Sequence, residues 1–280
     1  MDKQHFGAVK GTLEPNGSDR ASLMKTAHEA AELSKAAILP YFRNPISIEN
    51  KAGQGAFDPV TAADRAAERV IRDHIERHWP DHGLIGEEFG ASRENARVQW
   101  IIDPIDGTRS FIIGSPLWGT LIGVIDGGKP ILGLLDQPFT GERYFADSSG
   151  VFCRSPANLE PRPLRVRACD KLSNAVLTTT HPDFFTSEKD LDRFLALKSR
   201  VKLSLYGGDC YAYALLAAGT IDLVVESGLN TYDIAALIPI IEQAGGRITT
   251  WEGEAATHGG RILAAGDPAV HEAAMTILTG

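Results

Sequence analysis

The stretch Trp100-Ile-Ile-Asp-Pro-Ile-Asp-Gly-Thr-Arg-Ser-Phe111 carries more structural information than any other part of this chain. An apolar run leads into Asp103, and a second carboxylate, Asp106, stands just before Gly107 and Thr108. This order predicts a buried strand that ends in paired carboxylates and a glycine turn. Carboxylate oxygens select hard cations such as Mg²⁺, Ca²⁺ or Mn²⁺, and N–H groups at the start of a following helix suit a phosphate. The stretch therefore predicts a magnesium-dependent site for a phosphate ester.

Composition restricts the class of protein. A chain of 280 residues fits one large domain or two tightly packed halves. Hydrophobic residues make up 43% and charged residues 23%, as in ordinary globular enzymes. The net charge of −8 argues against nucleic acid as the main partner. An anionic substrate would then need local positive charge, which bound metal ions can provide.

The cysteines and the apolar runs point to a compartment. Cys153, Cys169 and Cys210 match no zinc motif and imply no disulfide framework, so we expect free thiols in a reducing compartment. No stretch approaches the roughly 18 consecutive apolar residues of a membrane span, and the N-terminus has no apolar signal-peptide core. We therefore expect a cytoplasmic protein without membrane association.

The first half of the chain changes from a helical to an extended pattern. Residues 1–18 are polar and are expected to form a loose tail. Apolar residues at helical spacing predict helices over about 19–42 and 61–79, with a short strand or hairpin over 46–57 between them. From residue 84 to 145, short apolar runs separated by Gly, Pro and Asp predict a largely antiparallel meander. Within it, Asp126-Gly127-Gly128 is expected to be a hairpin turn.

A composition shift with two prolines over 158–166 is the best candidate boundary. It would separate an N-terminal α+β half, 19–157, from a C-terminal α/β half, 158–280, within one compact catalytic unit. The second half alternates between strands and helices. Its expected strands cover 175–179, 201–205, 221–225 and 247–250, and its expected helices cover 189–198, 210–218, 232–244 and 269–278.

Acidic residues occur in four groups, each beside a turn or an element end. These groups are Asp58 with Asp64, Glu87 with Glu88, Asp103 with Asp106, and Asp233. Each group alone has a structural explanation, because Asp is favoured at helix N-termini and paired glutamates are common on surfaces. Carboxylates that follow buried runs, however, are costly unless they bind cations. The number of such acids therefore favours a cation site.

Four ordered motifs resemble the inositol monophosphatase family of Mg-dependent, lithium-sensitive phosphatases. They are Asp58-Pro-Val-Thr-Ala-Ala-Asp64, Ile85-Gly-Glu-Glu88, Trp100-Ile-Ile-Asp-Pro-Ile-Asp-Gly-Thr108 and Tyr232-Asp-Ile-Ala-Ala236, with Gly245-Gly246 behind them. The similarity covers nearly everything after residue 20. It implies a layered αβαβα sugar-phosphatase fold, classed as α/β (α+β), and usually a homodimer.

The resemblance also implies two or three Mg²⁺ ions, for which Mn²⁺ can substitute. Glu87, Asp103 and the carbonyl of Ile105 would bind the first ion, and Asp103, Asp106 and Asp233 the second. Most of these ligands come from the N-terminal half, and the C-terminal half supplies Asp233.

The same resemblance assigns catalytic and phosphate-binding roles. Asp64 with Thr108 would orient the attacking water, assisted by Glu87 through a further weakly held metal. The N–H groups of Gly107 and Thr108 would hold the phosphate oxygens. Lys51 matches a family lysine near the site, although a solvated loop lysine explains it equally well.

The substrate is expected to depend on Asp209 and Glu226. Asp209 replaces a small apolar residue of the classical inositol phosphatases, whereas Glu226 keeps the family's substrate-contacting acid. Two carboxylates beside the substrate's alcohol moiety would favour a cationic alcohol through charge-assisted hydrogen bonds. Asp209 could instead cap the helix that follows it. The motif Gly-Gly-Asp-Cys-Tyr-Ala-Tyr213 resembles the histidinol-phosphatase branch of the family.

We therefore expect a small-molecule phosphomonoesterase that hydrolyses L-histidinol phosphate in histidine biosynthesis. An inositol-1-phosphatase or a broad sugar phosphatase with the same mechanism is the alternative. A catalytically dead, metal-binding regulator is a hypothesis of another class. It is disfavoured because the acids that resemble the family's catalytic set are all present.

Overall fold

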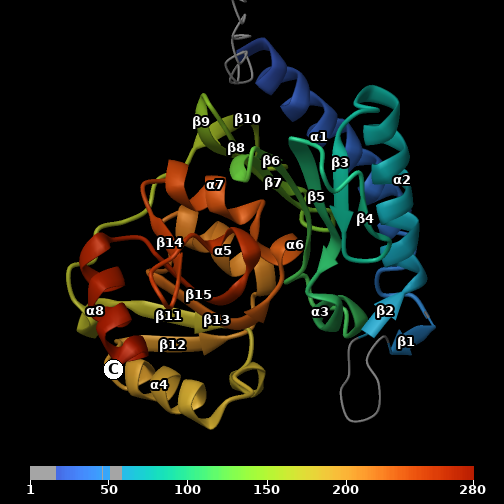
Figure 1. Ribbon diagram of the computed structural model, residues 1–280. Helices are drawn as coiled ribbons and strands as arrows, with labels where there is room; N and C mark the ends of the chain where they lie inside the picture. The colour runs from blue at the N-terminus through green and yellow to red at the C-terminus, as the bar shows by residue number, and fades with distance from the viewer. Residues whose placement is uncertain (1–16, 46, 51–58) are drawn as a thin grey trace, which may run out of the picture.

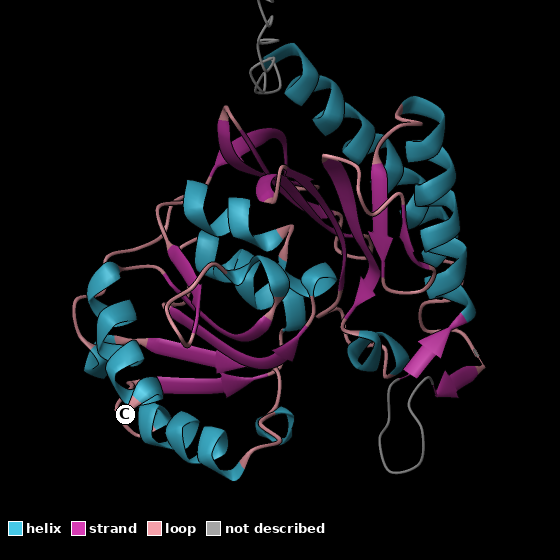
Figure 2. Ribbon diagram, in the orientation of Figure 1, coloured by secondary structure: helices cyan, strands magenta, loops and turns pink. Residues whose placement is uncertain are grey.

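The computed structural model describes residues 17–45, 47–50 and 59–280. Lys51, Asp58 and residues 1–16 of the expected tail lie outside the described residues. Five layers follow one another across the molecule: helices, a sheet, helices, a second sheet and helices (Figures 1 and 2). This arrangement confirms the expected αβαβα fold.

The first half consists of two long helices and an eight-stranded sheet. Its helices are α1 (Gly17–Ile38), α2 (Ala62–His78) and the short α3 (Thr108–Ile112). Its strands are β1 (Ile48–Asn50), β2 (Pro59–Thr61), β3 (Gly83–Gly86), β4 (Gly90–Ser92), β5 (Val98–Asp106), β6 (Gly119–Asp126), β7 (Lys129–Gln137), β8 (Glu142–Asp147), β9 (Gly150–Ser155) and β10 (Asn158–Pro163).

The order of the large sheet is β10-β9-β8-β7-β6-β5-β3-β4, and β1 pairs with β2 in a separate two-stranded sheet. From β5 to β10 each strand runs antiparallel to the next, as the predicted meander requires, and β3 is parallel to β5. The predicted turn at residues 126–128 joins β6 to β7. Helices α1 and α2 cover the outer face of this sheet (Figure 1).

Two predictions for this half need correction. The first helix ends at Ile38 rather than near Phe42. Pro40 explains the earlier end, because proline disfavours helical backbone in the residue before it and cannot donate an N–H bond. Strands β9 and β10 carry the sheet through residues that the sequence pattern left unassigned.

The second half is a five-stranded sheet with helices on both faces. Its strands are β11 (Val176–Thr179), β12 (Leu203–Tyr206), β13 (Leu223–Leu229), β14 (Arg247–Thr250) and β15 (Gly260–Ala265). Its α-helices are α4 (Glu188–Lys198), α5 (Asp209–Ala217), α6 (Thr231–Ile234), α7 (Leu237–Gln243) and α8 (Pro268–Thr279). Three short 3-10 turns are η1 (Leu172–Asn174), η2 (Pro182–Phe184) and η3 (Ala256–His258).

The strand order of the second sheet is β12-β11-β13-β15-β14. The alternating pattern predicted four of its strands, but it missed β15, which lies between β13 and β14 and is antiparallel to both. The predicted helix over 232–244 is two helices, α6 and α7, which meet at Ala235-Ala236. The chain passes from the first sheet to the second between Pro163 and Val176.

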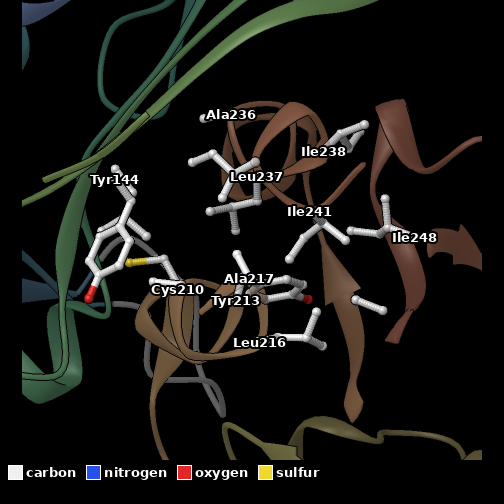
Figure 3. Packing of buried hydrophobic residues seen from close by; sticks show 14 of the residues in the cluster. Tyr144, Cys210, Tyr213, Leu216, Ala217, Ala236, Leu237, Ile238, Ile241 and Ile248 are labelled. Carbon is white, nitrogen blue, oxygen red and sulfur yellow. The ribbon is translucent and has the colours of Figure 1, made fainter. Parts of the chain in front are cut away.

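The two sheets enclose a shared core built around α5 and α7 (Figure 3). In it Leu216 and Ala217 of α5 pack with Leu237 and Ile241 of α7. The junction between α6 and α7 lies directly on the first sheet, because a Cβ on Gly133 of β7 would be only 1.8 Å from the carbonyl oxygen of Ala236. This close approach brings the start of α6 to the end of β5.

Candidate active site

A cavity of about 690 Å³ lies between the two halves and is lined by residues of both. From the first half come Glu87 and residues 106–109, and from the second half come residues around η2, the start of α5, the end of β13 and α6. The cavity therefore exists only when the two sheets are packed together.

Three carboxylates meet beside this cavity. Asp103 and Asp106 stand at the end of β5, where the pairing with β6 shifts register, and Asp233 lies on α6. One oxygen from each lies within 4.8 Å of the others, a spacing that could hold a metal ion. Asp103 is fully buried, and the other two are partly exposed toward the cavity. The structure thus brings together acids that are 130 residues apart in sequence.

Asp64 and Asp233 are held in place by the same local motif at the start of a helix. Each is the third residue of its helix and closes a capping box. Asp64 Oδ2 accepts hydrogen bonds from the N–H and the hydroxyl of Thr61, at 2.8 and 2.5 Å. Asp233 Oδ2 accepts from the N–H of Asn230 at 2.6 Å. The second oxygen of Asp64 is buried without a hydrogen-bond partner among the described residues, so it remains available to a water or an ion.

Burial and crowding raise the pKa of these acids. Desolvation is the main cause for Asp103 and Asp106, whose pKa values lie well above the usual range, and nearby carboxylates add to the effect. Desolvation also raises the pKa of Asp64 to about 6 and that of Asp233 to about 7. Carboxylates placed this close together in a buried site need a compensating cation to be ionised together.

The turn after β5 lines the cavity with residues 106–109. Gly107 has φ of 87°, in the left-handed region that favours glycine, and precedes α3. The hydroxyl of Thr108 donates to the carbonyl of Ile105 at 3.1 Å, and the N–H of Ile105 donates to Asp103 at 3.1 Å. Glu87, at the end of β3, also lines the cavity. The predicted metal and phosphate residues therefore lie around one centre. Lys51, predicted only as a possible residue near the site, lies outside the described residues.

Asp209 does not cap a helix through its side chain. It is the first residue of α5, Gly208 occupies the capping position, and no side-chain capping bond is present. Instead, Asp209 accepts a hydrogen bond from the hydroxyl of Ser110 across the interface between the halves, at 2.9 Å. The next residue, Cys210, donates its N–H to Asp106 at 2.6 Å. Desolvation raises the pKa of Asp209 to about 6.

Glu226 lies deeper in the same cavity. It is 2% exposed, and it accepts hydrogen bonds from the N–H and hydroxyl of Thr180, at 2.8 and 3.0 Å, and from the hydroxyl of Thr179 at 3.3 Å. Desolvation raises its pKa to about 8 despite these bonds. Asp209 and Glu226 thus both line the cavity, although neither is among the three clustered acids.

The sequence pattern did not identify several residues that line the cavity. Tyr213 is buried, and its hydroxyl has no hydrogen-bond partner among the described residues. The guanidinium of Arg109 lies 4.7 Å from the ring centre of Phe184, so α3 and η2 approach each other at the cavity. Tyr213 ends the motif Gly-Gly-Asp-Cys-Tyr-Ala-Tyr that resembles the histidinol-phosphatase branch, but the motif assigned it no role of its own.

Two sheets that enclose an acid-lined cavity, beside a cluster of carboxylates that could hold a cation, have the features of a metal-dependent enzyme. More particularly, the chain belongs to the inositol monophosphatase family, whose sequence profile matches residues 19–279. Its activity class is therefore that of a phosphatase of this family, whose members use Mg²⁺.

Individual relatives fall into more than one group. The chain is 43% identical to the chloroplastic bifunctional phosphatase IMPL2 of Arabidopsis thaliana, over 89% of this chain and 72% of the relative. It is 35% identical to a histidinol-phosphatase of Mycobacterium tuberculosis, over 74% and 79%. The solved structure of an inositol monophosphatase from Zymomonas mobilis is 37% identical, with a TM-score of 0.82 and coverage of 93% and 98%.

Within the part of the chain that the structure describes, no helix is both long and apolar enough to cross a membrane. The three cysteines are buried and unpaired, as the sequence predicted.

Proposed function

We propose that this protein is a Mg²⁺-dependent phosphomonoesterase that hydrolyses L-histidinol phosphate to L-histidinol and phosphate. The observation that carries the proposal is the pair Asp209 and Glu226, which places two carboxylates on the wall of a cavity that already contains a carboxylate cluster. The 35% identity to a histidinol-phosphatase supports it. Hydrolysis of this ester would be a step of histidine biosynthesis.

The donor set fits two divalent cations. Glu87, Asp103 and the carbonyl of Ile105 would hold one Mg²⁺, and Asp103, Asp106 and Asp233 would hold the other; Mn²⁺ could replace either, and Glu87 could reach a third. The acids supply only hard oxygen donors, and the clustered oxygens lie within 4.8 Å of one another. When bound, such ions neutralise the phosphate and acidify a coordinated water.

The protein groups would position the water and the phosphate. Asp64, fixed by its capping box, has a free oxygen that could accept a proton from water, and the hydroxyl of Thr108 would help to orient that water. The N–H groups of Gly107 and Thr108 would donate to the phosphate oxygens as negative charge develops there. These roles require no large movement, because the residues lie on element ends that are already hydrogen-bonded.

Asp209 and Glu226 would recognise the alcohol. An ammonium group in the substrate would gain charge-assisted hydrogen bonds from them, whereas inositol offers only neutral hydroxyls. The cation would also favour ionisation of both acids, whose pKa values are raised in the free protein.

The test compares two substrates in one variant. We expect Asp209→Asn to raise KM for histidinol phosphate by about 10-fold or more at pH 8, because a hydrogen bond to a charged group contributes about 1.5–3 kcal/mol. The same variant should change kcat/KM for inositol 1-phosphate by less than about 3-fold, since a neutral hydroxyl can bond to an amide. Phosphate release with Mg²⁺ measures both rates.

Equal losses on the two substrates would contradict the specificity role of Asp209 and return it to a purely structural role. Faster turnover of inositol 1-phosphate than of histidinol phosphate by the unmodified protein would favour the alternative, an inositol-1-phosphatase. The similarity to the Zymomonas mobilis structure supports that alternative. Fructose 1,6-bisphosphate and adenosine 3′,5′-bisphosphate complete the panel and test for a broader phosphatase.

We also propose that the protein is a cytoplasmic homodimer and that each chain is one catalytic unit of two halves. The expected boundary between 157 and 158 moves to the segment after Pro163, because β10 (Asn158–Pro163) pairs with β9 of the first sheet. The three unpaired cysteines support a reducing compartment. The edge strand β12 exposes Leu203 and Leu205 on one face, two apolar side chains that a second copy could cover. Light scattering during size-exclusion chromatography tests the dimer, and a mass of about one chain would exclude it.

A further inference from the structure

A second group of potential metal ligands lies away from the cavity, where α1 packs against α2. Glu29 extends from α1, and His74 and His78 lie one turn apart on α2. One ligand atom from each lies within 4.8 Å of the others. His74 is buried, Glu29 is partly exposed and His78 is exposed, so the group lies at the solvent edge of the helix pair.

The distance between the first two ligand atoms matches the coordination shell of zinc. His74 Nε2 lies 3.2 Å from Glu29 Oε2. Two ligands at zinc–ligand distances of 2.0–2.1 Å and a tetrahedral angle are about 3.3 Å apart. A metal ion could therefore take the place of the proton that now joins these two side chains, with little movement of either helix.

The third ligand is already oriented. His78 Nδ1 donates to the backbone carbonyl of His74 at 2.8 Å, so in the neutral ring Nε2 keeps its lone pair. A bond from the second ring nitrogen to a carbonyl is the usual arrangement that fixes a metal-binding histidine. The ring centres of His74 and His78 lie 4.3 Å apart, so the two imidazoles are direct neighbours on the surface of α2.

We propose that Glu29, His74 and His78 bind one divalent transition-metal ion of the zinc class, separately from the Mg²⁺ centre. Two imidazoles and one carboxylate suit Zn²⁺ far better than Mg²⁺. Water would complete the tetrahedron on the exposed side. The proposal goes beyond the phosphatase activity and does not depend on the substrate.

The surroundings favour a preformed site. Trp79 Nε1 donates to Thr26 Oγ1 at 3.0 Å, a hydrogen bond that fixes α1 against α2 near the three ligands. One cation competes for Glu29, because Lys25 Nζ lies 3.8 Å from its carboxylate. That pair is exposed on both sides and contributes little, so a bound metal ion could displace it.

A bound ion would join the two outer helices at the end of α2 that is opposite Asp64. Because α2 carries Asp64 in its first turn, the proposed ion would hold the helix that positions this residue without touching the active site. We therefore expect higher thermal stability with Zn²⁺ and no requirement for Zn²⁺ in catalysis.

The test is a calorimetric titration of the full chain with Zn²⁺ in excess Mg²⁺, which occupies the acidic centre. We expect one equivalent to bind. His78→Gln and Glu29→Gln should each weaken this binding more than about 10-fold, because even loss of a group that only orients a ligand weakens binding 10- to 100-fold. The matched controls are His258→Gln and Glu76→Gln, which change an exposed histidine and an exposed glutamate outside the group.

Three results would overturn the proposal: no Zn²⁺ binding to the unmodified chain, equal binding to His78→Gln and Glu29→Gln, or loss of binding in Asp233→Asn. The last would assign the ion to the acidic centre. Retained binding in Asp233→Asn, together with Mg²⁺-dependent phosphatase activity that is unchanged in His78→Gln, would support a separate site. Failure of the phosphatase assay in every form would contradict the proposed function but not this one.

Discussion

At the scale of single residues, the acidic centre combines a catalytic requirement with a cost in stability. Asp106 accepts a hydrogen bond from Cys210 and faces Asp103 and Asp233. Its pKa is raised well above the usual range, mainly by burial and then by Asp209. Without a cation, charged oxygens in this arrangement repel one another.

This conflict makes Asp106→Asn informative. The amide can still accept the Cys210 N–H bond, so the fold should remain, and the free energy of unfolding without metal should be equal to or higher than that of the unmodified protein. Turnover with Mg²⁺ should fall more than about 100-fold, since a metal ligand is lost. Urea unfolding and phosphate release measure the two effects. Near-normal turnover would refute the assignment of Asp106 as a ligand.

The sequence alone could identify Asp103 and Asp106, because they follow a strong apolar run and precede a glycine. Asp209 was harder to interpret. Its sequence position fits a helix cap, whereas its real partner, Ser110, is 99 residues away. Local sequence spacing carries no information on such a contact, and the resemblance to the family suggested a substrate role for Asp209 but not its bond to Ser110.

At the scale of elements, α2 links local structure to the site. Thr61 caps the helix by accepting from the N–H of Ala63 at 3.1 Å, and its hydroxyl donates to Asp64. The helix forms because apolar residues recur on one face and a capping box begins it. The same cap that starts the helix therefore orients the proposed catalytic carboxylate.

We expect Thr61→Ala to lower both stability and rate. Loss of an N-cap costs about 0.5–2 kcal/mol, and loss of the 2.5 Å bond frees Asp64 to rotate, so kcat should fall. Thr61→Ser keeps the hydroxyl and serves as the matched control. Thermal unfolding and kcat measure the two effects. A stable, slow Thr61→Ser variant would show that the methyl group, rather than the hydroxyl, matters.

The elements also show which patterns could be read from the sequence. The helix predicted over 61–79 agrees closely with α2, because its apolar spacing and cap signals coincide. Strand β15 was missed because Gly260-Arg-Ile-Leu-Ala-Ala265 contains only one residue with a strong preference for strands, Ile262. It is a strand because it fills the gap between β13 and β14, and this is a tertiary effect.

At the scale of the whole molecule, the site depends on how the two sheets pack. Asp103 and Asp106 belong to β5 of the first sheet, whereas Asp233 lies on α6, which follows β13 of the second sheet. The close contact of Gly133 in β7 with Ala236 brings α6 against the first sheet. Sequence periodicity predicts each half but not this docking, because no local signal marks a glycine that faces a distant helix junction. The fold of the whole was predicted from family resemblance instead.

Stability of the whole molecule should also depend on a histidine far from the site. His271 of α8 is 1% exposed, and its Nε2 lies 3.0 Å from the hydroxyl of Thr249, while Nδ1 has no partner among the described residues. Burial is the main cause that lowers its pKa from 6.5 to about 4, and the positive charge of Arg247 adds to the effect. The folded protein therefore keeps this ring neutral over a range in which the unfolded chain binds a proton.

This difference predicts acid destabilisation. His271 does not lower the free energy of unfolding well above pH 6.5, where the ring is neutral in both states. As the pH falls from 6.5 toward 4 the free energy of unfolding decreases, because only the unfolded chain gains a proton there. Each pH unit corresponds to about 1.4 kcal/mol, so between pH 7 and pH 5 His271 should account for about 2 kcal/mol. In His271→Gln, the decrease in unfolding free energy over this range should be smaller by that amount, as urea titrations would measure. His258→Gln, at an exposed histidine, should keep the full decrease. An unchanged decrease in His271→Gln would mean that other groups cause the acid sensitivity.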